Sequence, residues 1–260
     1  MRISIIGAGV MGEALIVALL KAGHAPGQIE IIEKRKERSD ELVDKYSIKA
    51  GHELSNTDVL LLVTKPQDVD GVLIEIKEKV KAGTLVISFA AGKKISTIAN
   101  GLNGKCQVVR VMPNTPTLVG KGAAGYSLGA GVTQHQQRFV TDLLNAAGIA
   151  VEVNEELQDA VTATSGSGPA YFFAFVEAMT KGAMDLGLSE AVASELVVQT
   201  LLGSAELLAT SGKSAKTLRE NVTSPNGTTY AALQSFAASD LEEMVAKAMK
   251  AARDRSIELS

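Results

Sequence analysis

Two stretches of the sequence carry residues whose types and spacing suit ligand chemistry, and the first is a glycine loop near the start. The loop reads Gly7-Ala8-Gly9-Val10-Met11-Gly12. It follows a largely apolar run, residues 3–6, that suits a buried strand, and it precedes a helical pattern. Strand, glycine loop and helix in this order place a dinucleotide pyrophosphate at a helix N-terminus, where free N–H groups and the helix dipole favour anions. The sequence therefore predicts a dinucleotide site here; a loop that only makes a turn is the alternative.

The second stretch ends one helical pattern and begins another. It reads Ser224-Pro225-Asn226-Gly227-Thr228-Thr229. Asn226 and Gly227 tolerate the left-handed backbone that such a turn uses. The helix that restarts at Thr228 offers free N–H groups and two hydroxyls, which suit a carboxylate. The residues leave a second interpretation open, in which Thr228 is an ordinary helix N-cap that binds nothing.

The residues after the second expected strand bear on which dinucleotide binds. Glu33 would accept hydrogen bonds from a ribose 2′-hydroxyl, which favours NAD(H), and would repel a 2′-phosphate. Lys34 and Arg35 would instead attract that phosphate, so the two signals oppose one another. A solvated run of charges without a ligand is the alternative.

Three further strand patterns end in small residues and prolines, which let a flat cofactor lie against the backbone. The segments are Thr64-Lys65-Pro66, Phe89-Ala90-Ala91-Gly92 and Pro113-Asn114-Thr115-Pro116. Each taken alone reads equally well as an ordinary turn. Together, beside a glycine loop, they favour a cofactor cleft outside the carboxyl ends of the strands.

The elements that must position these residues change type near residue 155. Before it, strand patterns at 2–6, 28–32, 59–63, 85–88, 107–112, 123–128 and 149–153 alternate with helical patterns at 12–22, 34–46, 67–80, 94–100 and 133–147. This alternation predicts an α/β domain, residues 1–154, with a doubly wound parallel sheet and helices on both faces. After it, helices are expected at 155–164, 169–186, 189–210, 215–222, 228–239 and 240–257. Residues 155–260 are therefore expected to form an all-α domain.

One expected helix, residues 189–210, lacks the polar face that a surface helix of a monomer shows. Its segment 196–202 is apolar on nearly every side. We expect this helix to be buried between subunits; burial within a single chain is the alternative.

Composition excludes several classes of function. The chain has 260 residues, of which 46% are hydrophobic and 21% charged, so a compact soluble core is expected. A net charge of −3 without a Lys/Arg cluster argues against nucleic acid as the partner. The sequence carries no leader pattern and no run of eighteen apolar residues, which argues against a membrane span.

The sequence also lacks the residues of metal and hydrolytic sites. Cys106 is the single cysteine and is expected to be a buried hydrophobe, and His24, His52 and His135 lack the spacing of metal ligands. No Ser/His/Asp constellation supports hydrolysis. We therefore expect no metal and a cytoplasmic location.

Six motifs resemble those of the Δ1-pyrroline-5-carboxylate reductase family. They are IIGAGVMGEA at 5–14, TKP at 64–66, AAG at 90–92, VMPNTP at 111–116, SGSGPAY at 165–171 and LRENVTSPNGTT at 218–229. The resemblance covers essentially the whole chain, and the last three motifs are much more specific than the glycine loop. It implies reduction of 1-pyrroline-5-carboxylate to L-proline with NADPH or NADH, the last step of proline biosynthesis. It also implies a Rossmann domain, then a helical dimerisation domain that interlocks two subunits, often in a ring of dimers.

The resemblance further implies roles for cofactor residues. The backbone of Gly7 to Gly12 would hold the pyrophosphate. Asn114 would lie near the nicotinamide. The ribose and nicotinamide would be bordered by Val63, Thr64, Lys65, Pro66, Ala90, Ala91 and Gly92.

For the substrate, the resemblance implies that the turn from Ser224 to Thr229 grips the carboxylate. The hydroxyl of Thr229 would hydrogen-bond the ring nitrogen, as the catalytic contact. Glu155 lies where relatives have a carboxylate near the substrate.

Three departures from the family pattern matter. Asn226 stands where the family turn usually has glycine, and the turn is expected to survive because asparagine tolerates positive φ. Gly212-Lys213 and Ser214-Ala215-Lys216 replace an acidic residue and a His-Pro-Gly, which puts a substrate contact from that loop in doubt. Glu33 stands where NADP-preferring relatives often have Ser, Thr or Asn, which predicts a weaker preference for NADPH.

Two other functions remain open at this point. A related imine or β-hydroxyacid reductase would share the architecture, and the latter would need a lysine as proton donor, for which Lys181 is the candidate. A non-catalytic dinucleotide-binding module would keep the glycine loop but would not need the turn at 224–229.

Overall fold

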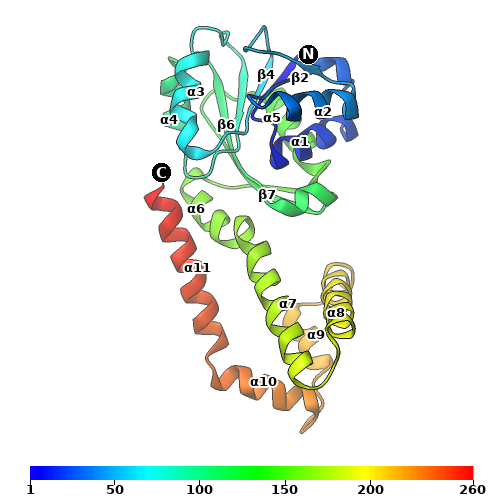
Figure 1. Cartoon of the computed structure of the whole chain (residues 1–260). Coiled ribbons are helices and arrows are strands. Elements are labelled where there is room, and N and C mark those ends of the chain that lie inside the picture. Colours follow the sequence, from blue (N-terminus) through cyan, green and yellow to red (C-terminus); the bar gives the residue numbers. More distant parts are fainter. Residues whose placement is uncertain (260) are drawn as a thin grey trace. The chain divides into compact units, whose positions relative to one another are not determined.

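The computed structural model describes residues 1–259, which separate into two compact units (Figure 1). The first unit comprises Met1–Pro169 together with the described residues from Ala251 on, and the second comprises Ala170–Lys250. The expected α/β part followed by a helical part is confirmed. The domain limit between residues 154 and 155 stays a prediction.

The first unit is built on an eight-stranded sheet in the order β3-β2-β1-β4-β5-β6-β7-β8. The strands are β1 (Ile3–Ile6), β2 (Ile29–Ile32), β3 (Lys49–Ala50), β4 (Val59–Leu62), β5 (Leu85–Ser88), β6 (Gln107–Met112), β7 (Gly122–Leu128) and β8 (Gly148–Glu152). The strand order reverses direction between β1 and β4, which is the topological switch point where such sheets bind ligands.

The sheet is parallel from β3 to β6, but β7 runs antiparallel to β6, and β8 is parallel to β7. The expectation of a wholly parallel sheet is therefore wrong at this edge. Residues 113–121 alone connect β6 to β7, and a parallel crossover needs a dozen residues or more. The short edge strand β3 was also not expected, because its two residues carry no hydrophobic pattern.

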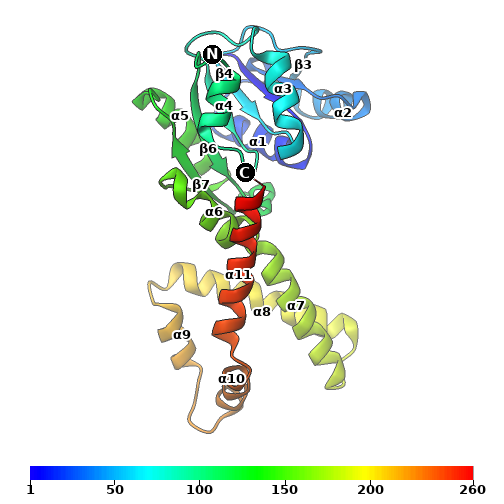
Figure 2. The same cartoon turned by 90° about the vertical axis from the view of Figure 1, so that its left-hand side faces the viewer.

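Helices cover both faces of the sheet (Figures 1 and 2). One core joins the sheet to α1 (Val10–Lys21), α2 (Lys36–Tyr46) and α5 (Gln134–Asn145). The other core joins it to α3 (Val69–Ile76) and α4 (Ile95–Gly101). Successive side chains of a strand point to opposite faces, so β4 contributes Leu61 to the first core and Leu60 to the second.

Short helical turns complete the first unit. They are η1 (Pro26–Gln28), η2 (Pro66–Asp68), η3 (Thr115–Val119), η4 (Glu155–Leu157) and η5 (Thr162–Gly166), with the short helix α6 (Gln158–Val161) between the last two. The single helix expected at 155–164 is thus divided into three pieces, and η5 is one turn of π-helix. Such turns are rare and often lie at functional sites.

The second unit contains helices only. They are α7 (Gly168–Asp185), α8 (Glu190–Thr210), α9 (Ala215–Asn221), α10 (Thr228–Ala238) and α11 (Leu241–Glu258), of which α7 begins and α11 ends among residues of the first unit. Ser189 and Ser214 cap α8 and α9 by accepting hydrogen bonds from backbone N–H groups. The loop that departs from the family pattern therefore uses Ser214 as a cap.

Helix α8 is exposed within the single chain. Leu196, Val198 and Leu202 are 54%, 43% and 58% exposed, while Ala193 and Val197 are buried. The alternative of burial within one chain is therefore wrong. By length and composition α8 is also the one helix in the described part of the chain that suits a membrane span, although Glu195 interrupts its apolar residues.

Candidate functional site

The glycine loop between β1 and α1 has the shape that a pyrophosphate needs. Gly7 has a φ of 89°, and a Cβ there would lie 2.6 Å from the carbonyl oxygen of Val63. A Cβ on Gly12 would lie 2.5 Å from the carbonyl oxygen of Gly7, so this glycine lets α1 pack against the loop. A Cβ on Gly9 would meet nothing within 4 Å, and Gly9 caps α1 without a side-chain hydrogen bond. The N-terminus of α1 therefore opens onto free space.

The predicted cofactor residues lie along one edge of the sheet, each directly after a strand. Gly7 N–H donates to Ile32 in β2, Val63 N–H donates to Ile6 in β1, and Phe89 N–H donates to Leu62 in β4, at 2.9 to 3.0 Å. These bonds align the carboxyl ends of neighbouring strands. The edge therefore brings together Gly7, Glu33, Val63, Thr64, Lys65, Pro66, Ala90, Ala91 and Gly92.

Thr64 supplies a second sign of a ligand at this edge. Its Oγ1 is buried and has no hydrogen-bond partner among the described residues. Its methyl group would be 3.4 Å from a Cβ on Gly7, so it adjoins the glycine loop. Buried polar atoms normally have partners, so this hydroxyl fits a group that completes the site. The open glycine loop and the unpartnered hydroxyl both suit a dinucleotide.

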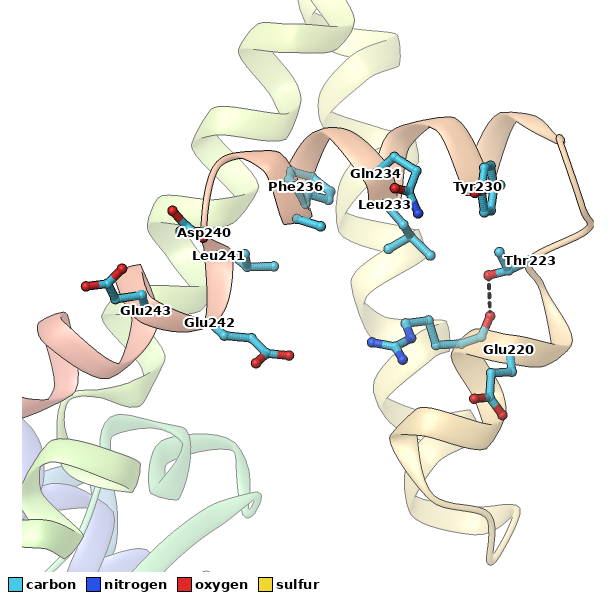
Figure 3. Close-up of a pocket in the computed structure, with 12 residues that line it drawn as sticks. Glu220, Thr223, Tyr230, Leu233, Gln234, Phe236, Asp240, Leu241, Glu242 and Glu243 are labelled. Carbon is cyan, nitrogen blue, oxygen red and sulfur yellow. Dashed lines mark hydrogen bonds between the residues drawn. The ribbon is translucent and has the colours of Figure 1, made fainter.

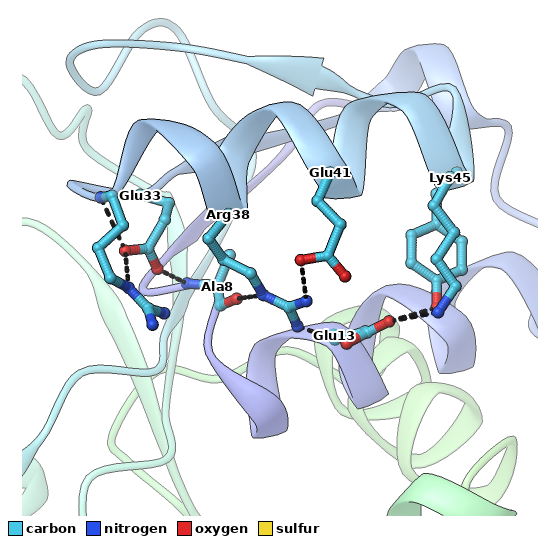
Figure 4. A network of polar contacts seen from close by, with 8 residues as sticks. Ala8, Glu13, Glu33, Arg38, Glu41 and Lys45 are labelled. Carbon is cyan, nitrogen blue, oxygen red and sulfur yellow. Dashed lines mark hydrogen bonds and ion pairs between the residues drawn. The ribbon is translucent and has the colours of Figure 1, made fainter.

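Glu33 is fixed by three hydrogen bonds in which its carboxylate accepts. Oε2 accepts from Ala8 N–H at 3.0 Å, and Oε1 accepts from the N–H and the Nε of Arg35, both at 3.0 Å (Figure 4). Burial raises the pKa of Glu33, but these hydrogen bonds outweigh it, so the pKa lies below its usual value. Glu33 is therefore an anion, and its charge is matched by Arg35. A surface hollow beside the pair is lined by Arg35, Lys36, Glu37, Arg38 and Glu41.

Asn114 follows β6 and uses both ends of its amide within the protein. Oδ1 accepts from Ala123 N–H at 2.9 Å, and Nδ2 donates to the carbonyl of Ser165 at 3.1 Å. It thereby ties η5 to the start of β7. A Cβ on Gly166 would lie 2.5 Å from Met112 Cε, so the small residues of this turn permit a close approach to the end of β6.

Glu155 contacts two groups of the first unit. Its Oε1 accepts from Ile95 N–H at 2.6 Å and lies 3.6 Å from Nη1 of Arg110. Arg110 is buried in β6 and lies 3.6 Å from Asp159 Oδ1, which also accepts from Ser256 Oγ at 2.7 Å. The carboxylate of Glu155, which is predicted to lie near the substrate, is therefore held in place by the buried Arg110.

The Ser-Pro-Asn-Gly turn connects α9 to α10 in the second unit. Asn226 has a φ of 59°, as the tolerance of asparagine predicts. The N-cap of α10 is Gly227, and Thr228 is the first helical residue, so the alternative that Thr228 caps this helix is wrong. Since glycine has no side chain to cap with, the first N–H groups of α10 remain available. Thr229, the second residue of α10, is half-buried between the exposed Thr228 and Tyr230.

A separate hollow lies between α9, α10 and the start of α11 (Figure 3). Leu233, Phe236 and Leu241 give it an apolar wall, and Glu242 and Glu243 lie at the α11 side. Thr223 follows the end of α9, and its hydroxyl donates to the carbonyl of Arg219 in that helix at 2.6 Å. No residue from 224 to 229 lines this hollow, so it is distinct from the turn.

Sequence reasoning missed two charged residues next to the site. Arg110 lies in the apolar strand QVVRVM, and a lone arginine in such a strand signals a buried acidic partner. Arg38 lies on α2 and donates through Nε to the carbonyl of Ala8 in the glycine loop at 3.2 Å. Nothing in the sequence around Arg38 distinguishes it from the neighbouring charges.

The remaining candidate residues, Lys181 and Cys106, lack the surroundings of a catalytic group. Lys181 is exposed and pairs with Asp185 one turn along α7, which removes the support for a β-hydroxyacid reductase. Burial raises the pKa of the Cys106 thiol, which makes it a poor nucleophile. Among residues 1–259 no three metal-ligand side chains gather.

Comparisons with known proteins agree with this arrangement. Residues 155–259 match the family model described as pyrroline-5-carboxylate reductase dimerisation, and residues 2–92 match the one described as coenzyme F420-dependent NADP oxidoreductase. The chain is 40% identical to the pyrroline-5-carboxylate reductase of Pseudomonas aeruginosa, over 100% of this chain and 97% of the relative. It is 39% identical to that of Corynebacterium melassecola, over 99% and 98%.

Solved structures give the same result. A pyrroline-5-carboxylate reductase from Coxiella burnetii matches with a TM-score of 0.92 at 34% identity, over 100% of this chain and 98% of the other. The pyrroline carboxylate reductase of Plasmodium falciparum, solved with NADP bound, matches with a TM-score of 0.87 at 29% identity, again over 100% and 98%.

Proposed function

The chain belongs to the pyrroline-5-carboxylate reductase family, and on that basis we propose how its residues carry out the reduction of 1-pyrroline-5-carboxylate to L-proline with NAD(P)H. The activity makes the chain an oxidoreductase of proline biosynthesis. The observation that carries the proposed site is the open glycine loop beside the unpartnered hydroxyl of Thr64.

The cofactor is assigned to the carboxyl edge of the sheet. The backbone N–H groups at the start of α1, from Gly9 to Gly12, bind the pyrophosphate. Glu33 accepts from the adenosine ribose 2′-hydroxyl, and Lys34 and Arg35 lie beside it. Bound NAD(P)H supplies the hydride. The edge residues border the ribose and nicotinamide: Val63, Thr64, Lys65, Pro66, Ala90, Ala91, Gly92 and Asn114.

The substrate is assigned to the turn from Ser224 to Thr229. The free N–H groups at the start of α10 bind the carboxylate, because an uncapped helix N-terminus favours an anion. The Thr229 hydroxyl then hydrogen-bonds the ring nitrogen and holds the imine in one orientation. Glu155 uses Oε1 for contacts within the first unit, and we assign its Oε2 to the substrate. The protein thus contributes positioning, and no general base of high pKa is required.

The assembly proposed here is a homodimer in which α8 is covered by the partner subunit. The chain contains a dimerisation domain, and α8 exposes an apolar surface that a monomer would not keep. We propose further that dimers associate in a ring and that the enzyme works in the cytoplasm, in keeping with its single, buried cysteine.

The decisive experiment is oxidation of NADH and NADPH by the purified protein with 1-pyrroline-5-carboxylate. Thr229→Val removes the hydroxyl and keeps the shape, and we expect it to lower kcat at least ten-fold. Thr210→Val is the matched control, because the Thr210 hydroxyl only bonds the carbonyl of Glu206 in its own helix. Equal rates for both variants would remove Thr229 from the mechanism.

A further inference from the structure

Ala8, in the glycine loop, is held from two sides by side chains outside the loop (Figure 4). Its N–H donates to Glu33 Oε2 at 3.0 Å, and its carbonyl accepts from Arg38 Nε at 3.2 Å. The two peptide groups that flank the Ala8 Cα are therefore both fixed. Glu33 comes from the end of β2 and Arg38 from α2, so the loop is oriented by the neighbouring βα unit.

The carbonyl that Arg38 binds determines where the next N–H group points. The carbonyl of Ala8 and the N–H of Gly9 belong to one planar trans peptide group and point in opposite directions. With the carbonyl turned toward Arg38, the Gly9 N–H is directed to the other side of the loop. A Cβ on Gly9 would meet nothing within 4 Å, and among residues 1–259 the Gly9 N–H has no acceptor.

Arg38 is itself held by carboxylates. It pairs with Glu13 of α1 through Nη2 and with Glu41 of its own helix through Nη1 at 2.8 Å. Glu13 also accepts from Lys45 Nζ at 2.9 Å and from the Tyr46 hydroxyl at 2.8 Å. The Arg38 side chain is only 17% exposed, and two anions match its charge. It is therefore suited to hold a backbone group and poorly suited to bind a phosphate directly.

We propose that Arg38 is a positioning residue for the cofactor: by holding the Ala8 carbonyl, it directs the Gly9 N–H toward the pyrophosphate. The inference rests on the cofactor site proposed above. Glu13 holds Arg38 in place. It lies on α1, the helix that follows the glycine loop, and pairs with Arg38 on α2. Neither side chain touches the substrate in this scheme, so the effect is confined to cofactor binding.

The test is the affinity of the full-length protein for NADH, measured by titration of cofactor fluorescence without substrate. Arg38→Met is expected to weaken binding at least ten-fold, because the Ala8–Gly9 peptide group is then free to rotate. Arg138→Met is the matched control: it removes an exposed arginine of α5 whose side chain makes no hydrogen bond or ion pair among the described residues. The control is expected to stay within two-fold of the parent protein.

Steady-state kinetics separate positioning from a general loss of structure. Arg38→Met is expected to raise KM for NADH and to leave kcat and KM for 1-pyrroline-5-carboxylate within about three-fold. A purely structural role would instead lower kcat together with the folded fraction, and that outcome would overturn the proposal.

Arg38→Lys keeps the charge and the pairing with Glu13 but loses the Nε donor, and it carries the test if Arg38→Met does not fold. Binding by Arg38→Lys is expected to remain at least five-fold weaker. Full recovery of NADH affinity in this variant would reject positioning in favour of charge. If the parent protein itself bound no NADH, the proposed cofactor site would be rejected. If Arg38→Met bound NADH as well as the parent protein does, only the role proposed for Arg38 would be rejected.

Discussion

Buried Arg110 of β6 forms an ion pair with half-buried Glu155 of η4, with 3.6 Å between Nη1 and Oε1, and Asp159 lies at the same distance from Nη2. One buried cation thus holds two carboxylates, of which only Glu155 is proposed to face the substrate. This arrangement allows the two to be compared directly, since each loses the same partner when its charge is removed.

We expect Glu155→Gln to raise KM for 1-pyrroline-5-carboxylate at least five-fold. Asp159→Asn is the control, because it weakens the same arginine pair and should lower the melting temperature to a similar extent without changing KM. Steady-state kinetics and thermal unfolding of both variants check this. Equal KM values for the two would restrict Glu155 to a structural role.

Alanine substitutions in the glycine loop should have two different effects, one on stability and one on cofactor binding. Gly12→Ala places a Cβ 2.5 Å from a backbone oxygen and should lower the free energy of unfolding by about 1–3 kcal/mol. Gly9→Ala has room for its Cβ, so stability should be unchanged, but the methyl group fills the space assigned to the pyrophosphate and should weaken NADH binding at least ten-fold. Gly27→Ala, exposed and unhindered, is the control for both measurements. Normal NADH binding by Gly9→Ala would argue against a pyrophosphate at this position.

Cofactor preference should depend on Glu33. Glu33→Ser removes the carboxylate that repels a 2′-phosphate and frees Arg35 from its ion pair. We expect the ratio of kcat/KM for NADPH to that for NADH to rise at least ten-fold. Parallel assays with the two cofactors measure it, and an unchanged ratio would remove Glu33 from cofactor selection.

The sequence predicted most of the fold because its signals are local. Apolar strands such as Leu85–Ser88 and helices with clear ends, such as Ala215–Asn221, were placed to within one residue. The antiparallel β7 was not predicted, because strand direction depends on the length of the connection rather than on the residues of the strand. The division of 155–166 into three pieces was not predicted either. The last piece ends where Gly166 lies against Met112, a tertiary contact that no local pattern encodes.

The candidate site was predictable where backbone geometry requires a particular residue type. Gly7, Gly12 and Asn226 could be predicted from the sequence. Few other residue types adopt the positive φ of Gly7 and Asn226 or fit as close to a backbone oxygen as Gly12 does. Arg38 was missed because its importance comes from a carbonyl thirty residues earlier. Its neighbours Lys36 and Glu37 look the same in the sequence.

Acid should weaken the link between α1 and α2. Hydrogen bonding by Lys45, followed by Arg38 and Tyr46, outweighs burial and lowers the pKa of Glu13 from 4.5 to about 2. Because the folded protein binds this proton more weakly than the unfolded chain, the stabilisation is complete above about pH 4.5 and is lost as the pH falls toward 2. It amounts to about 3 kcal/mol. Glu13→Gln should flatten the dependence of unfolding free energy on pH in this window.

The control for that measurement is Glu53→Gln. Glu53 pairs with Lys79, and its pKa is also lowered, but its side chain is 73% exposed. Its contribution should be small because solvent screens the pair. If both variants changed the pH dependence of the unfolding free energy equally, the network around Glu13 would stabilise the fold no more than an exposed ion pair does.

Helix α8 should govern association. Leu202→Glu introduces a charge on its exposed apolar surface, and we expect the dimer to dissociate at micromolar protein concentration. Ile74→Glu, which changes a 69% exposed residue of α3, should remain dimeric. Sedimentation velocity distinguishes the two, and a dimeric Leu202→Glu variant would place the interface elsewhere.

The hydrogen bond between Ser256 and Asp159 has a consequence for synthesis of the protein. The chain leaves its first unit after Pro169 and supplies the last part of that unit only from Ala251 on. During synthesis, the polar cluster of Arg110, Glu155, Asp159 and Ser256 in the first unit therefore stays incomplete until the final helix has been made. A chain truncated anywhere in the helical segment would lack that closing contact between Ser256 and Asp159.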